Sequence, residues 1–84
     1  MPFPHAFIKL TDDERKRISR ELQTMALKGQ NRKRKRLQAV WLSDKGHTFK
    51  QISTMLDVTY QSVKTWVSLY RQVGLDEYLA RMKK

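Results

Sequence analysis

The sequence predicts an all-α fold, a small domain of four to five helices in a chain of 84 residues. Three observations support this fold class. Apolar residues recur at spacings of three, four and seven positions. Capping residues and glycines stand where the periodic segments begin and end. No segment shows the alternation of a β-strand. We expect an extended arm at residues 1–10, which holds Pro2 and Pro4, and one domain at residues 11–84.

The first helix is expected from about residue 12 to residue 27. Thr11 and Glu14 have the spacing of a capping box, in which each side chain bonds the other residue's backbone amide. Gly29 ends the helix. Its apolar face consists of residues four and three positions apart: Ile18, Leu22 and Met25.

The second helix is expected from Asn31 to Lys45, before Gly46. Its first turns hold five successive basic residues, from Arg32 to Arg36. Successive helical residues are about 100° apart, so these cations surround the helix and cannot all meet one surface. The predicted buried stripe follows the basic run: Leu37, Val40 and Trp41.

Two further helices follow, joined by a turn at residues 57–59. Thr48 and Gln51 form a second capping box at the start of the third helix, and Thr59 caps the fourth. Gly74 ends the fourth helix, and a short, frayed terminal helix is expected to reach Met82. The expected core residues of these helices are Ile52, Met55, Leu56, Val63, Trp66, Val67 and Tyr70.

Residues 48–73 therefore have the pattern of a helix-turn-helix in a homeodomain-like fold. The second helix of this motif fits the major groove of DNA. Its predicted outward face carries five polar candidates for reading bases: Tyr60, Gln61, Lys64, Thr65 and Ser68. Gln61 matches the N6 and N7 edge of adenine, and Lys64 matches O6 and N7 of guanine. The alternative is that this is only the solvated face of an amphipathic helix.

The charge of the chain supports a polyanionic partner. Lys and Arg number 18 against 8 Asp and Glu, which gives a formal net charge of +10. The candidates for phosphate contacts are Arg32, Lys33, Arg34, Lys35, Arg36, Lys50, Thr59 and Arg71. Thr59 acts here through the backbone N–H groups at a helix N-terminus. A charged linker or a localisation signal is the alternative interpretation of the basic run.

Other function classes are disfavoured. The chain has no cysteine, and His5 and His47 lack acidic companions at ligand spacing, so we expect no metal and no cofactor. No apolar run approaches the length of a membrane span, and the N-terminus lacks the features of a secretory signal. We expect a cytoplasmic protein without membrane partners. Nothing in the sequence brings Asp44, Asp57 and Asp76 together as a metal triad, so we expect no enzyme.

Several motifs also match a known family. They include Leu10-Thr-Asp-Asp-Glu-Arg15, Gln51-Ile-Ser-Thr-Met-Leu-Asp-Val-Thr59 and Tyr70-Arg-Gln-Val-Gly-Leu75. Over residues 10 to about 76, the sequence resembles the N-terminal DNA-binding region of bacterial insertion-sequence transposases of the mariner-like superfamily. The resemblance implies that the five base-reading candidates occupy recognition-helix positions and that the partner is duplex DNA, such as an element's terminal repeat. Members of that family usually have Gly where this chain has Asp57, and Ala where it has Ser53.

The expected function is sequence-specific binding of double-stranded DNA. The protein would be either the DNA-binding part of a transposase or a transcriptional regulator derived from one, in the nucleoid of a bacterium. Such transposases also carry a catalytic domain with three metal-binding acids, which this chain does not contain, so a separately encoded catalytic subunit is an expected partner. Two alternatives stay open. One is a protein-interaction module, including a homodimer formed through the apolar face of the first helix. The other is a general nucleic-acid-binding module for RNA or non-specific DNA.

Overall fold

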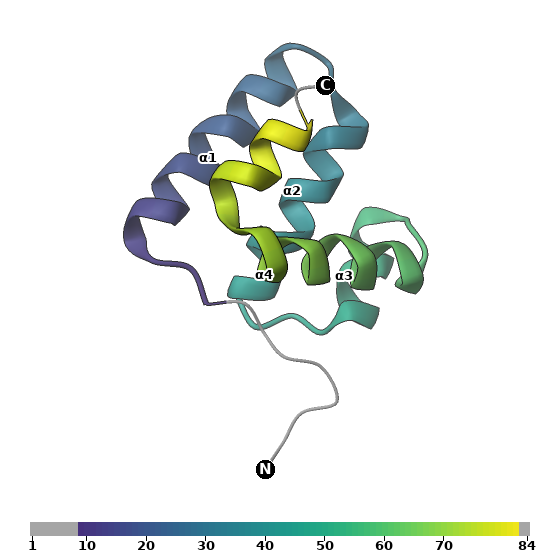
Figure 1. Cartoon of the computed structure of the whole chain (residues 1–84). Helices are drawn as coiled ribbons and strands as arrows, with labels where there is room; N and C mark the ends of the chain where they lie inside the picture. Colours follow the sequence, from purple (N-terminus) through teal and green to yellow (C-terminus); the bar gives the residue numbers. More distant parts are fainter. Residues whose placement is uncertain (1–8, 83–84) are drawn as a thin grey trace.

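The computed structural model describes residues 9–82. It contains α1 (Asp12–Leu27), α2 (Asn31–Asp44), α3 (Phe49–Leu56) and α4 (Tyr60–Met82) (Figure 1). No strand occurs within these residues, and the prediction of an all-α fold is confirmed. Helices α1, α3 and α4 begin where their predicted caps place them. Helix α2 begins at Asn31 as expected and ends one residue earlier than expected. The predicted arm falls mostly on residues 1–8, which lie outside the described residues.

The first two helices pack against each other as an antiparallel pair (Figure 1). Thr11 and Glu14 exchange the two bonds of the predicted capping box at the start of α1. Gly29 has a φ of 70°, a left-handed conformation that lets the chain reverse into α2. The pair is held together by fully buried side chains such as Ile18 from α1 and Leu37 from α2. The apolar stripes predicted for both helices therefore face each other.

The turn between α3 and α4 is as short as the sequence predicts. Asp57 adopts a left-handed conformation with φ 57° and ψ 51°, which Asp tolerates better than most residues other than Gly and Asn. The amide of Val58 donates to the carbonyl oxygen of Ser53 at 3.0 Å, which closes the end of α3. Thr59 Oγ1 accepts from the amide of Ser62 at 3.1 Å and so caps α4. The substitution of Asp57 for the usual Gly leaves the turn intact.

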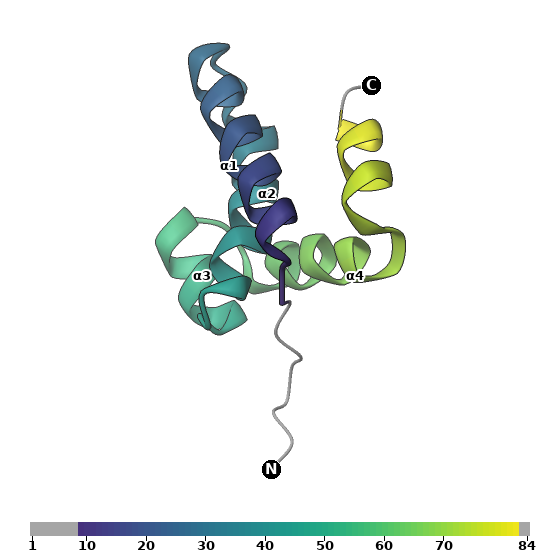
Figure 2. The ribbon, with the colours of Figure 1, turned by 90° about the vertical axis from the view of Figure 1, so that its left-hand side faces the viewer.

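Gly74 divides α4 into two limbs, residues 60–73 and 75–82. Its φ of 82° and ψ of 174° interrupt the helix. The second limb turns away from the first and runs roughly alongside the α1–α2 pair, in the chain direction of α1 and opposite to that of α2 (Figures 1 and 2). The expectation of a frayed terminal helix is wrong, because its apolar side chains belong to the core: Leu75, Tyr78, Leu79 and Met82. The hydroxyl of Tyr78 donates to the carbonyl oxygen of Arg36 on α2 at 3.4 Å.

One predicted core residue is misplaced. The Met55 side chain is 53% exposed, whereas Ile52 on the same helix is fully buried. The core side of this eight-residue helix is occupied by Phe49, Ile52 and Leu56, and Met55 lies beside it. Sequence spacing alone cannot separate Met55 from that face, since residues three and four apart are both neighbours on a helix. Trp41 and Trp66 are partly buried against the core, as predicted.

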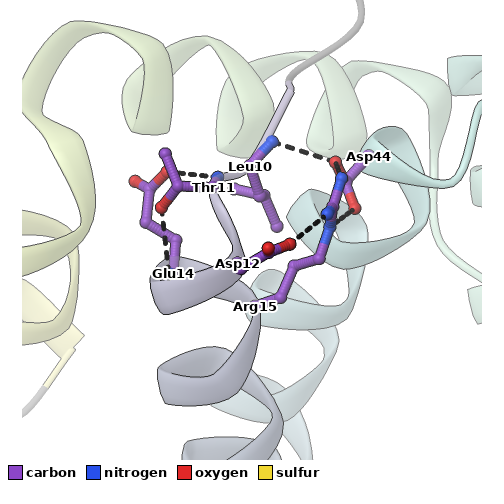
Figure 3. Close-up of polar contacts among 6 residues, drawn as sticks. All are labelled: Leu10, Thr11, Asp12, Glu14, Arg15 and Asp44. Atoms are coloured by element: carbon purple, nitrogen blue, oxygen red, sulfur yellow. Dashed lines mark hydrogen bonds and ion pairs between the residues drawn. The ribbon is translucent and has the colours of Figure 1, made fainter.

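A buried carboxylate joins α1 to the end of α2. The Asp44 side chain is 2% exposed and accepts from Arg15 Nε at 2.8 Å (Figure 3). The backbone amide of Leu10 also donates to Asp44 Oδ1, at 2.9 Å. The guanidinium of Arg15 holds the pKa of Asp44 below its ordinary value. Asp44 therefore fixes both the start of α1 and the chain that enters it.

Candidate nucleic-acid interface

The first limb of α4 has one buried side and one exposed side. Val63 and Val67 are fully buried in the core, and Tyr70 follows them on the same side. Gln61, Lys64 and Thr65 are exposed on the outward side, while Ser68 is partly buried. The period of 3.6 residues per turn separates these two sets. The structure thus presents the predicted polar face to solvent.

Tyr60 lies at the edge of this face, where α4 begins. Its side chain is 48% exposed, and its ring makes an edge contact with the ring of Phe49 on α3, with 6.1 Å between the centroids. Phe49 is itself buried and was not among the predicted core residues. We call the first limb of α4 the reading helix, because it carries the candidates for reading bases. The aromatic contact therefore joins the first residue of the reading helix to α3.

A polar network fixes the other end of the first limb. The Tyr70 hydroxyl donates to Glu14 Oε2 at 2.8 Å, although the two residues are 56 positions apart. Burial, with a smaller contribution from this hydrogen bond, raises the pKa of Tyr70. The Thr11 amide, and then the Tyr70 hydroxyl, lower the pKa of Glu14. Both ends of the limb are therefore anchored, which fixes the direction of its outward face.

The five cations at the start of α2 do not share one surface. Arg32, Lys35 and Arg36 line a hollow of about 490 Å³, together with residues of the turn and of α4. Lys33 lines a different hollow, between α1, α2 and the end of α4. Arg34 lines neither of these hollows. The sequence predicts that the five basic residues surround α2. Which of them lie beside the first limb of α4 depends on how α4 packs on α2, and this packing is seen only in the structure.

The remaining phosphate candidates lie on α3, on the turn that follows it and on the first limb of α4. Lys50 is exposed on α3, and Arg71 is exposed near the end of the first limb of α4. Thr59 is exposed too, but its hydroxyl is engaged by Ser62, from whose amide it accepts and to whose Oγ it donates. What Thr59 offers an anion is therefore the helix N-terminus that it caps.

In the described part of the chain, the positive charge on α3, on the first limb of α4 and at the start of α2 is not neutralised by ion pairs. Within residues 9–82, the four ion pairs engage Arg15, Arg17 and Arg81, and none involves a candidate for DNA contact. The acidic residues lie mainly on α1, at the end of α2 and on the second limb of α4. Asp57 in the turn is the one acid of the helix pair. The reading helix is thus flanked by cations that are available to a polyanion.

The described residues contain no metal site of the kind considered from sequence. No group of three or more His, Asp or Glu residues in positions 9–82 could hold a metal ion. Asp44 is bound by Arg15, and Asp76 is bound by Arg17 at 2.6 Å. A search of the same residues finds no helix with the length and apolar character needed to cross a membrane.

These features define a helix-turn-helix domain: two helices joined by a tight turn, the second with a buried apolar side and an exposed polar side. Comparison with protein families gives the same result. The homeodomain-like domain matches residues 30–77, more than half of the chain, and the protein belongs to that family. Comparisons with curated proteins and with solved structures find no match. The matched region spans α2, α3 and the first limb of α4, and domains of this kind place their last helix in the DNA major groove.

Proposed function

We infer that this protein binds double-stranded DNA in a sequence-specific manner, with the first limb of α4 in the major groove. One observation carries this proposal. Gln61, Lys64 and Thr65 are exposed on the side of a helix whose opposite side is fully buried by Val63 and Val67. A helix anchored in this way can enter a groove only with its polar side, which has the donors and acceptors that match base edges.

The basic residues supply the affinity that does not depend on sequence. Arg32, Lys35 and Arg36 on α2 lie on one side of the reading helix, and Lys50 and Arg71 add exposed charge on α3 and α4. Contacts of this kind neutralise phosphates and release counterions, which strengthens binding to any duplex. They also set the register in which Gln61 and Lys64 meet the bases.

The resemblance to mariner-like insertion-sequence transposases supports a more specific role. The protein would be the DNA-binding part of a transposase, acting together with the catalytic part of that transposase, or a nucleoid-associated regulator derived from one. This role is one of binding and not of catalysis, in keeping with Asp44 and Asp76 being held by arginines. If the preferred site is an element's terminal repeat, the transposition role is supported. If it is the promoter of the protein's own gene, the regulatory role is supported.

Selection from a random duplex library tests the proposal. We expect a defined site, and its symmetry reports whether one copy or a homodimer binds. Gln61→Ala should relax the preference at one position of that site, while Gln23→Ala, at an exposed position on α1, serves as the matched control. A contradicting result would be that no sequence is enriched and that the protein binds duplex DNA, RNA and heparin equally well. The protein would then be a general polyanion binder, which its net charge of +10 permits.

A further inference from the structure

We propose that the hollow between the start of α2 and the start of α4 is a phosphate-binding site that takes one backbone phosphate of duplex DNA. The proposal rests on the proposed function and deepens it. It assigns a place on the molecule to one DNA strand, the strand that passes beside the reading helix. It also selects three cations from the run of five.

The lining of this hollow has the chemistry that a phosphodiester needs. One wall comes from the first turns of α2 and carries Arg32, Lys35 and Arg36, with Asn31 beside them. The other wall comes from the turn and the first turns of α4: Val58, Ser62 and Trp66. Cationic, amide and hydroxyl donors therefore surround the hollow, and no carboxylate lines it. Arginine and lysine are the side chains that hold phosphate oxygens most strongly.

One residue that lines this hollow has a buried donor without an acceptor in the part of the chain that the structure describes. The Nε atom of Arg36 is buried and has no hydrogen-bond partner among the described residues. A buried N–H without an acceptor is costly, and the cost is larger for a charged group. Arg36 lines the hollow and keeps donor capacity that the described residues do not use, so its guanidinium attracts an anion held there. The Nε atom of Arg34 is in the same condition but does not belong to this hollow, so it does not contribute to the proposal.

Two other cationic hollows fit a phosphate less well. The one that contains Lys33 and Lys28 is also lined by Glu21, whose charge opposes an anion. The one that contains Lys16 and Arg20 lies between α1 and Trp41, and its third cation, Arg15, is already bound to Asp12 and Asp44. Neither includes a residue of the first limb of α4. Of these three hollows, the one beside Ser62 and Trp66 is next to the reading helix.

The position of the site explains how it would act. Ser62 and Trp66 directly follow Gln61 and Thr65 in the chain, so they lie at the same levels of the helix. A phosphate held beside them fixes the depth and angle at which the outward face meets the bases. Loss of such a contact weakens binding to all DNA sequences equally, because every duplex has the same backbone.

The experiment measures binding of the selected duplex and of a shuffled duplex over a range of salt concentrations. Lys35→Ala should weaken binding of both duplexes equally. It should also reduce the slope of the logarithm of the binding constant against the logarithm of the salt concentration by about one unit. Arg32→Gln is a second variant, at an exposed position, in case Lys35→Ala perturbs folding. Lys16→Ala, an exposed lysine of α1, removes the same charge away from the hollow and should leave the slope unchanged.

A scan of single neutral methylphosphonate linkages through the site then locates the contact. At one linkage, the methylphosphonate should weaken DNA binding by wild type and by Lys16→Ala severalfold. It should not weaken DNA binding by Lys35→Ala any further. Additive losses at every linkage, or equal slopes for Lys35→Ala and Lys16→Ala, would overturn the phosphate site. If discrimination between the two duplexes still depends on Gln61 in that case, the proposed function stands. If wild type does not distinguish the two duplexes, the proposed function fails instead.

Discussion

Arg15 Nε donates to Asp44 Oδ2 at 2.8 Å across 29 positions of sequence, and this pair joins α1 to the helix-turn-helix region. The homeodomain-like match begins at residue 30, so α1 lies outside it. Two further contacts, Glu14 with Tyr70 and Arg17 with Asp76, also connect α1 to α4. We therefore expect α1 to contribute to the stability of this domain, because its polar contacts anchor both limbs of the helix that presents the candidate reading face.

Replacement of Asp44 tests this expectation. Asp44→Ala removes the acceptor of the Leu10 amide and the buried partner of Arg15, and we expect a loss of about 1–3 kcal/mol in the free energy of unfolding. Urea denaturation measures it. Asp12→Ala is the control, because Asp12 is the other carboxylate on Arg15 but is 91% exposed, and its loss should change little. Equal midpoints for the two variants would contradict the role given to Asp44.

The stability of the protein should depend on acid pH through the same region. The pKa of Asp44 is lowered from 3.8, chiefly by Arg15, and that of Glu14 is lowered from 4.5, chiefly by the Thr11 amide. A carboxyl group with a lowered pKa in the folded state contributes stability above its unfolded pKa and loses that contribution as pH falls through the folded value. We expect constant stability from pH 7 to about pH 5 and a decline below about pH 4. An acid decline of the same size in the Asp44→Asn, Glu14→Gln double variant would refute this assignment.

Gly74 should be required for its backbone conformation. Its φ of 82° is unfavourable for an L-residue, while no atom of residues 9–82 lies within 4 Å of the position that a Cβ would occupy. Gly74→Ala should therefore destabilise the domain by about 1–3 kcal/mol through backbone strain alone. D-alanine, introduced at this position by chemical synthesis, favours positive φ and should restore stability. Thermal unfolding of the two proteins compares them, and equal destabilisation by both stereoisomers would indicate a steric cause instead.

Two residues of α3 should respond differently to truncation. Ile52 is fully buried, so Ile52→Ala should cost about 2–5 kcal/mol. Met55 is 53% exposed, so Met55→Ala should change the free energy of unfolding by less than about 0.5 kcal/mol. Denaturant titration of both variants gives the comparison. A large loss for Met55→Ala would restore the sequence-based assignment of Met55 to the core.

The helix boundaries were predictable because their signals are local. Thr11, Thr48 and Thr59 each cap a helix at the position that the sequence indicates, and Gly74 interrupts α4 as expected. The packing of the second limb was not predictable. Tyr78 is buried only because the chain bends at Gly74 back along α2, and the direction of that bend is not encoded by spacing.

The candidate site shows the same division. The outward face with Gln61 and Lys64 follows from helical periodicity, and the structure exposes both side chains. The Arg15–Asp44 pair and the hollow with Arg32 and Lys35 depend on how separate helices pack. Sequence spacing places charges around one helix but does not state which of them a neighbouring helix will approach.

If the exposed side of the first limb of α4 reads bases, substitutions there should change the ratio of two dissociation constants, that of the selected duplex and that of a shuffled duplex. We expect Lys64→Ala and Gln61→Ala each to weaken binding of the selected duplex by about 1–3 kcal/mol while binding of a shuffled duplex stays the same. Equal weakening of the selected and the shuffled duplex by both variants would contradict the claim.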